Sequence, residues 1–461
     1  MNRHSKTDKI DKTHYGVRAV LAMAVVSAFA VPMAAHAGAF QLPTDNAAGW
    51  ARANAGGSLF PDDPTAAYNN PAAMAFFSAP VLQATATFIR PSAEFNGTSQ
   101  DIDGNPVTGN NPNGFHKFVP FPNMAWVAPV NDWFAVGGAL TVPYGLQSEY
   151  NPTWAGRYFG TRTDLQSVAV SLSAAFKLND RFSAGVGILG QRTKAQLNTV
   201  IDPDGAAQAL FNLPLTPQQN DEQLNVNVKR KFSFGYFGGF EFKPTDQDSF
   251  GFSYHSRVKN TLSGNYAIYG GATGKALLQL ASKLDPSLPT INPNGAPASA
   301  RFDTPAFASL DWLHAFSDRF SAAASVKWTQ WSTFQNLTLM SNGQQLFALQ
   351  EQYKDSYMFS VGGDYKLTDQ WTLRGGIGYD ETPTVILSRD PRVPDGARKL
   401  LGVGIGYKAN QHMSFDLGYQ HQFVSDTAIR LVNQPLLGGA TMDGYFADAG
   451  DVVSVTGTYH F

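Results

Sequence analysis

The sequence predicts an all-β membrane protein, a 14-stranded antiparallel transmembrane β-barrel with an N-terminal plug inside its lumen. Three observations lead to this prediction. Apolar and polar side chains alternate with a period of two, short turns alternate with long connections, and the last alternating strand ends in Phe461. All three are typical of bacterial outer-membrane barrels, whose strands present one face to lipid and the other to the lumen.

The alternation is clearest at residues 355–367 and is repeated at residues 164–178. In the first segment one face carries Tyr357, Phe359, Val361, Tyr365 and Leu367, and the other carries Ser356, Ser360, Gly362, Asp364 and Lys366. A period of two indicates a strand with two different faces. The same pattern recurs through residues 80–461, which we therefore assign to the barrel.

The connections between these strands fall into two classes. Short polar turns end just before Trp133, Phe182, Phe250, Phe320, Trp371 and Met413. Long connections are expected at 92–120, 144–163, 197–226, 266–300, 341–354, 382–397 and 424–448. Six short turns that alternate with seven long connections give 14 strands with both ends on one side. A soluble β-sandwich is the alternative, but the segregated connections and the aromatic residues at strand ends favour the barrel.

Residues 1–37 have the form of a cleavable signal peptide. Basic residues flank an apolar run from Ala19 to Met33, and Ala35-His36-Ala37 supplies small residues for cleavage. A retained anchor is the alternative, but the run is shorter than the ~20 residues of a spanning helix. The segment holds five of the 34 Lys/Arg and two of the 36 Asp/Glu, so the mature chain is acidic. An acidic chain does not suggest a nucleic-acid partner.

Residues 38–79, here called the plug segment, break the strand pattern. They are rich in Ala, Gly, Asn and Pro, with short helical turns expected near Asn46–Ala53 and Thr65–Tyr68. A barrel of 14 strands is too wide for its own side chains to fill, so a segment of this length could fold back inside. A disordered leader is the alternative. The chain has no cysteine, and we expect no metal, no cofactor and no disulfide.

A family resemblance follows from these motifs. Gly38-Ala39-Phe40-Gln41-Leu42, Asp62-Asp63 and Asn70-Pro71-Ala72 resemble the hatch of the FadL-type long-chain fatty acid transporter family. The similarity continues through residues 121–134, 144–146, 163–165, 254–266, 331–337 and 353–359. The resemblance implies a monomeric outer-membrane protein that takes up hydrophobic small molecules by passive diffusion, in contact with outer-membrane lipid and lipopolysaccharide. A terminal aromatic such as Phe461 is typical of barrels handed to the barrel assembly machinery.

The resemblance also implies a lateral exit through a kinked third strand. In residues 133–146, Gly137-Gly138 and Pro143-Tyr144-Gly145 depart from a regular strand, since proline cannot donate to a ladder and glycine permits a bulge. In family members the asparagine of the Asn70-Pro71-Ala72 triplet approaches this kink, so a latch between Asn70 and Gly145 is expected. The alternative is a strand that ends at Pro143.

Two further groups of residues are candidates for ligand contact. Apolar residues in two long outer connections suggest a capture groove: Leu210, Phe211, Leu213, Leu277, Leu280 and Leu284. The alternative is that the two segments pack on each other. Arg257, Lys259 and Lys354 could meet a carboxylate headgroup, although such charges also tie a plug to a wall. Family positions that contact an acid headgroup fall near uncharged Leu197 and Gln350, which leaves room for neutral substrates.

Two other function classes remain as alternatives. A general or substrate-selective aqueous porin has the same wall, and high ion conductance would distinguish it. An enzyme would need a nucleophile and a base brought together, and none of the mature histidines lies in a nucleophile motif. We therefore expect no catalysis.

Overall fold

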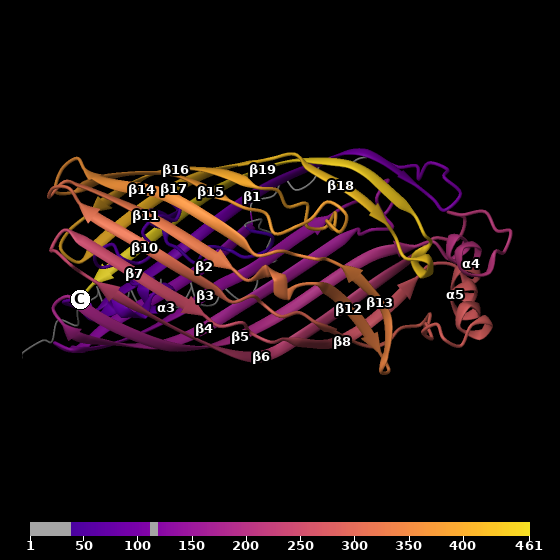
Figure 1. The fold of residues 1–461 in the computed structure, drawn as a ribbon, viewed down its shortest axis with the longest axis horizontal. Coiled ribbons are helices and arrows are strands. Elements are labelled where there is room, and N and C mark those ends of the chain that lie inside the picture. Colours follow the sequence, from indigo (N-terminus) through magenta and orange to yellow (C-terminus); the bar gives the residue numbers. More distant parts are fainter. Residues whose placement is uncertain (1–37, 111–118) are drawn as a thin grey trace, which may run out of the picture. The chain divides into compact units, whose positions relative to one another are not determined.

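The structure, a computed structural model, describes residues 38–110 and 119–461, so the predicted signal peptide lies outside the described residues. The described strands form one antiparallel sheet, which the pairing of β1 with β19 closes into a barrel (Figure 1). The wall consists of β1 (Val81–Gln100), β2 (Val119–Asn131), β3 (Phe134–Glu149), β4 (Arg162–Asn179), β5 (Phe182–Ile201), β6 (Glu222–Phe242), β7 (Asp248–His255), β10 (Phe307–Ala315), β11 (Phe320–Thr329), β14 (Ser356–Lys366), β15 (Trp371–Asp380), β16 (Arg398–Lys408), β17 (Met413–Val424) and β19 (Thr441–His460). These are the 14 strands that the sequence predicts.

Short strands continue several wall strands beyond a break, at the end that carries the long connections. They are β8 (Thr261–Tyr269), β9 (Ala296–Arg301), β12 (Asn336–Ser341), β13 (Gln344–Gln350) and β18 (Thr427–Val432). The long connection predicted at 341–354 runs from β11 to β14 over residues 330–355 and contains a hairpin of β12 and β13. Its turn is Asn342-Gly343, with φ of 49° and 79°. A two-residue hairpin turn with positive φ at both positions favours this Asn-Gly dipeptide, which is the signal that the sequence analysis missed.

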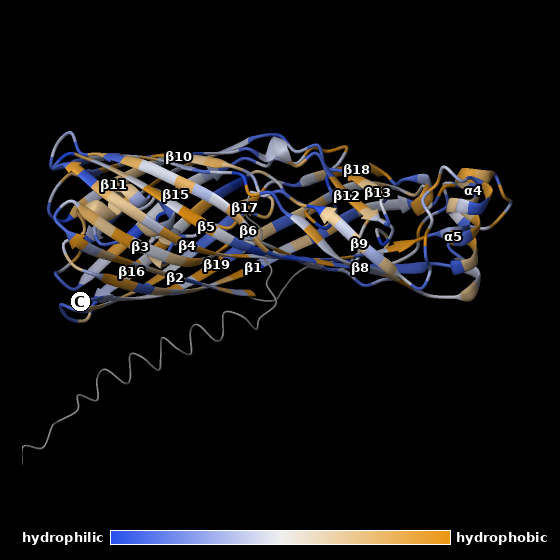
Figure 2. Cartoon of the chain, turned by 90° about the horizontal axis from the view of Figure 1, so that it is seen from below, coloured by the Kyte–Doolittle hydropathy of each residue, from blue (hydrophilic) through white to orange (hydrophobic). Residues whose placement is uncertain are grey.

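The two faces of the wall have the predicted chemistry. Large apolar side chains such as Leu172, Ile188 and Phe234 are exposed on the outside. Inside, hydroxyl groups pair between neighbouring strands, as in Thr87 with Ser454 at 2.8 Å and Ser167 with Thr193 at 2.8 Å. Figure 2 shows apolar and polar residues alternating along the strands. The apolar face suits lipid, and the hydrogen-bonded polar face lines the lumen.

The plug segment contains α2 (Ala47–Ala51), α3 (Ala66–Asn69) and the 3₁₀ helix η1 (Pro71–Phe76). It is bonded to strands all around the wall. The Ala47 N–H donates to Thr456 on β19, the Gly56 N–H donates to Ser325 on β11, and the Ser183 hydroxyl on β5 donates to the Ala72 carbonyl. The wall therefore surrounds this segment.

Close contacts at glycines and a series of linked ion pairs hold α2 against β14–β17. A Cβ on Gly402 would lie 2.5 Å from the Ala51 carbonyl oxygen, so only glycine admits so close an approach. Arg52 bonds to Asp364 at 3.1 Å, and Arg374 joins Asp364 to Asp416. Buried charges are paired here, as low polarity requires.

The remaining helices lie at or near the end of the long connections: α4 (Pro203–Phe211), α5 (Ala272–Leu284), η2 (Trp331–Thr333) and η3 (Pro435–Leu437). Helices α4 and α5 pack on each other beyond the strands (Figure 1). Within the described ranges, no helix combines the length and apolar character needed to cross a membrane.

Candidate functional site

Strand β3 loses one of its two neighbouring strands halfway along its length. From Phe134 to Leu140 it pairs with β2, and the pairing stops at Met124–Leu140. On its other side it pairs with β4 from Phe134 to Glu149, with a register shift between Thr141 and Tyr144 that brackets Pro143. The Val142 N–H turns instead to the Asn123 side chain, 3.3 Å away. Among the described residues, the ladder between β2 and β3 is thus interrupted above Leu140.

The start of the plug segment binds the edge of β3 that no longer pairs with β2. The Gly145 N–H donates to the Phe40 carbonyl at 3.0 Å, and the Leu42 N–H donates to the Pro143 carbonyl at 2.9 Å. These two bonds form an antiparallel bridge between Gln41 and Tyr144. Phe40 to Leu42 therefore occupy the place that β2 would take in a regular sheet, and they satisfy backbone groups that a break in the ladder exposes.

Asn70 lies elsewhere than its expected position at this kink. Its side-chain amide donates to the Phe240 carbonyl on β6 at 3.2 Å, and its Oδ1 accepts from the Ala72 N–H at 3.3 Å. A Cβ on Gly239 of β6 would lie 2.4 Å from Asn70 Oδ1, so glycine makes room for the side chain. Asn70 thus caps η1, which begins at Pro71, and ties it to β6. The plug residue that accepts the hydrogen bond of Gly145 is Phe40. The sequence pointed to its motif but not to this contact.

Two adjoining cavities lie at the outer end of the lumen. The larger has a volume of about 140 Å³ and the smaller about 50 Å³. Both are lined by Leu197, Ala300 and Leu337. The smaller one is also lined by Phe40 and Leu146, which places it beside the bridge between the plug segment and β3. We call the two cavities together the upper pocket.

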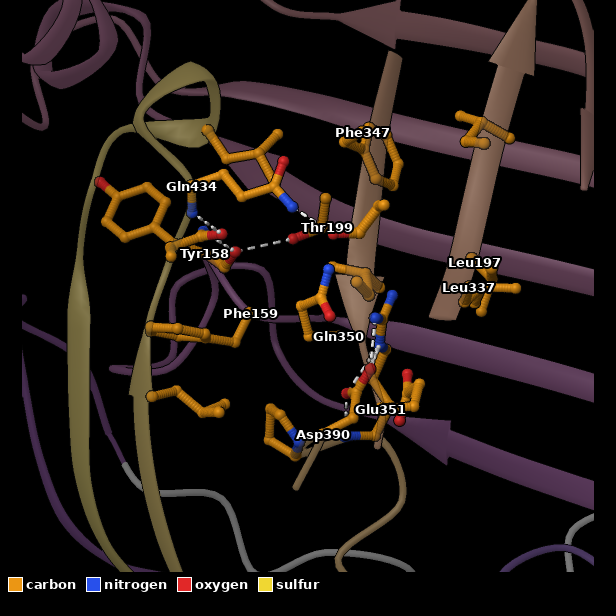
Figure 3. A pocket seen from close by; sticks show the side chains of 18 of the residues that line it. Tyr158, Phe159, Leu197, Thr199, Leu337, Phe347, Gln350, Glu351, Asp390 and Gln434 are labelled. Atoms are coloured by element: carbon orange, nitrogen blue, oxygen red, sulfur yellow. Dashed lines mark hydrogen bonds and ion pairs between the residues drawn. The ribbon is translucent and has the colours of Figure 1, made fainter. Parts of the chain in front are cut away.

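The polar end of the upper pocket consists of Glu351, Asp390 and Arg392, which line both cavities. Figure 3 shows Glu351 and Asp390 together at one edge of the larger cavity. Arg392 bonds through Nε to both Asp390 oxygens at 2.9 Å, and its Nη2 also bonds to Asp390. Glu351 is 3% exposed, and its Oε2 has no hydrogen-bond partner among the described residues.

The basic candidates from the sequence lie outside the upper pocket. Lys354 and Lys259 are exposed, and Arg257 pairs with Asp303. Arg257 and Lys259 also lie in the break between β7 and β8. The sequence analysis missed Glu351, Asp390 and Arg392. The alternation could not have revealed Glu351, because continuing the pattern of residues 355–367 backwards places Lys354 on the lumen face, whereas Gln352, with a φ of 50°, breaks the pattern.

An aromatic cluster closes the inner side of the upper pocket. The rings of Phe40 and Trp331 meet edge to face with centroids 4.5 Å apart. Phe334 and Tyr353 pack against each other and against Phe40. Residues far apart in sequence thus fix the position of Phe40, and with it the bridge to β3.

The capture candidates lie on α4, on α5 and at Leu213, two residues after the end of α4. Leu210 packs against the apolar cluster that lines the upper pocket. On α5 the buried residues are Gly274, Leu278 and Ala281, while Leu277 and Leu280 are half-buried and Leu284 is exposed. The expected packing of the two segments on each other is therefore present, and part of the apolar stripe stays accessible.

A closed 14-stranded barrel with an apolar outer face and a polar lumen defines an integral, multi-pass protein of the bacterial outer membrane. The chain belongs to the family described as outer membrane protein transport protein (OMPP1/FadL/TodX), whose model matches residues 28–461. The family is one of transport proteins, as the resemblance implies.

Individual relatives agree with this assignment. The chain is 30% identical to the long-chain fatty acid transport protein of Escherichia coli K12, over 87% of this chain and 91% of that one. The crystal structure of a Pseudomonas aeruginosa FadL homologue covers 92% of this chain and 100% of its own, with 40% identity and a TM-score of 0.88. The Pseudomonas putida toluene transporter TodX is 15% identical, with a TM-score of 0.66 and coverage of 90% and 98%. That last likeness shows the shared fold.

Proposed function

We propose that this protein takes up hydrophobic small molecules, long-chain fatty acids or aromatic and aliphatic hydrocarbons, by passive diffusion with lateral exit between β2 and β3. The observation that supports this route is the position of the upper pocket. Its apolar lining reaches Phe40 and Leu146, beside the place where the β2–β3 ladder stops. A solute in this pocket therefore lies next to the interrupted part of the wall.

The direction of transfer follows from the solvent on each side. Each CH₂ group gains roughly 0.8 kcal/mol on leaving water, so an apolar solute moves into lipid more readily than into an aqueous periplasm. An opening toward the bilayer delivers such a solute without exposing it to water again. No energy source is needed, because the solute follows its own gradient.

The plug segment, residues 38–79, acts in this scheme as a hatch. It obstructs the aqueous route through the lumen, and its first residues hold the free edge of β3. The apolar residues of α4 and α5 collect the solute at the cell surface. We infer that the mature protein, residues 38–461, acts as a monomer among lipid and lipopolysaccharide after removal of residues 1–37 and assembly through a signal that ends in Phe461. It moves its substrate unchanged, without catalysis.

Substitution of Gly145 tests the exit. Gly145→Arg places a long side chain at the β3 edge and should reduce uptake of a labelled hydrophobic solute into outer-membrane vesicles by at least about tenfold. Gly145→Ala, which adds one methyl group, is the matched control and should retain most of the uptake. Heat-modifiable migration on gels confirms assembly of both variants. Normal uptake by an assembled Gly145→Arg protein would exclude exit at this position, and high ion conductance of the wild type would favour a porin.

A further inference from the structure

The charges of the upper pocket suggest which polar end a substrate carries. Three charged residues among the described residues line its two cavities: Glu351, Asp390 and Arg392. Two are acids and one is a base. The base is already occupied, since Arg392 directs Nε and Nη2 to Asp390. A carboxylate entering the pocket would meet an ion pair and a further acid.

Glu351 is the group that lacks a partner. Its side chain is almost fully buried, and Oε2 accepts no hydrogen bond from the described residues. Its backbone carbonyl is fixed by the hydroxyl of Ser388 at 2.6 Å, which holds the residue at the pocket edge. A buried carboxyl oxygen is costly to leave unsatisfied, whether the group is ionised or neutral, and in both forms it can accept a hydrogen bond.

Other basic side chains near the pocket bond to groups outside it. Arg389 donates through Nε to the Thr384 hydroxyl at 3.0 Å and through Nη1 to the Ala428 carbonyl. Arg398 pairs with Asp395. Neither residue lines the two cavities. The described part of the pocket therefore offers an acceptor at Glu351 and no unpaired basic side chain.

We propose that the upper pocket selects hydrophobic molecules whose polar end is neutral and donates a hydrogen bond, such as long-chain alcohols or phenols, with Glu351 as the acceptor. Long-chain carboxylates bind more weakly, because a charge that enters a pocket of low polarity needs a partner, and Arg392 is already paired with Asp390. Alkanes also bind more weakly than alcohols, because they leave Glu351 unsatisfied. This inference rests on the proposed uptake of hydrophobic small molecules, and it ranks alcohols and phenols above the fatty acids and hydrocarbons named there.

Three probes with the same chain length test the selection in the full protein, purified and reconstituted in lipid nanodiscs. Dodecan-1-ol, dodecanoate and dodecane share one apolar tail and differ at one end. At about pH 8 dodecanoate is ionised. Direct binding of the radiolabelled compounds should rank dodecan-1-ol first, with dodecanoate weaker by roughly tenfold or more. Equal or tighter binding of dodecanoate would overturn the proposal without any variant.

Variants of Glu351 assign the effect to this side chain. Glu351→Gln keeps an acceptor at this position, so dodecan-1-ol binding should change little and dodecanoate should remain the weaker ligand. Glu351→Leu removes the acceptor and should lower dodecan-1-ol binding to the level of dodecane. Glu94→Gln, at an exposed position on β1, is the control and should leave all three affinities unchanged. Unchanged dodecan-1-ol binding in Glu351→Leu would overturn the role of Glu351.

Uptake measurements separate this proposal from the transport function. If dodecanoate binds and is taken up as well as dodecan-1-ol, the selection is wrong and the transport function stands. If none of the three probes enters vesicles through the wild-type protein, both proposals are wrong.

Discussion

The Gly145 N–H donates a hydrogen bond of 3.0 Å to the carbonyl of Phe40, 105 positions earlier in the sequence. With the reciprocal bond from Leu42 to Pro143, it makes the start of the plug segment the edge partner of β3. Phe40 also lines the upper pocket, as does Leu146, the residue after Gly145. The plug segment therefore meets the pocket and the interrupted wall at one point.

Removal of one donor at this bridge should loosen β3. Leu42→Pro deletes the N–H that bonds to Pro143, while Leu42→Ala keeps it and loses a similar apolar contact. Loss of one such bond costs about 1 kcal/mol. We therefore expect hydrogen exchange of the Gly145 amide to be roughly fivefold faster in Leu42→Pro than in Leu42→Ala. Equal exchange in the two variants would show that the bridge does not control this edge.

Removal of Arg52 should release α2 from the wall. The Arg52 side chain is 2% exposed and bonds to Asp364, so breaking this buried pair should cost about 3 kcal/mol. We expect faster proteolysis within residues 44–64 and higher ion conductance through the barrel. Arg181→Ala, at an exposed turn between β4 and β5, is the control. Unchanged protection in Arg52→Ala would mean that the glycine contacts at Gly402 and Gly418 suffice to hold α2.

The exposed part of the α5 stripe should matter for capture. Changing Leu277, Leu280 and Leu284 together to Ser leaves the buried Leu278 to dock the helix. Uptake at low substrate concentration should fall several-fold, because less apolar surface is accessible at the entrance. Uptake at high substrate concentration should stay unchanged. The control, Leu278→Ser, should instead disturb docking of the helix, and unchanged uptake by the triple variant at every concentration would limit the stripe to packing.

Docking of α4 should depend on pH through Asp202, its N-cap residue. Burial raises the pKa of Asp202 to about 6, the nearby Asp221 and Asp204 add to this, and the N–H groups of Gly205 and Gln218 oppose it. A carboxyl with a raised pKa binds its proton more tightly in the docked state. Docking is therefore strongest below about pH 4 and weakens as pH rises through about 6.

Hydrogen exchange of α4, corrected for the intrinsic rates, measures this dependence. Protection should be roughly tenfold greater at about pH 5 than at about pH 7. Asp202→Asn keeps the N-cap acceptor and cannot titrate, so its protection should be flat across this range. A wild-type profile as flat as that of Asp202→Asn would contradict the assignment.

The sequence determined the repeating parts of this protein. The period of two from Tyr357 to Leu367, and its repetition along the chain, settled the strands and the 14-stranded barrel, because each lipid-facing strand must show this alternation independently of its neighbours. The six short turns followed from local polar residues before an aromatic one. The hairpin turn at Asn342-Gly343 could also have been predicted from the sequence. We assigned no hairpin there, because we expected the outer connections to be long.

Tertiary structure alone decided the contacts between distant residues. Pro143 predicted an irregular strand, but only the fold shows that Phe40 and not Asn70 lies against Gly145, since each can supply hydrogen bonds and the choice depends on the path of the plug segment. The upper pocket has the same origin. Lys354 was the natural candidate because basic residues attract carboxylates, whereas in the structure Glu351 is buried and Lys354 is exposed, on either side of Gln352 with its positive φ of 50°. The local alternation of residue types determines the strands of the wall. The folding of the plug segment and the long connections determines which side chains meet inside the barrel.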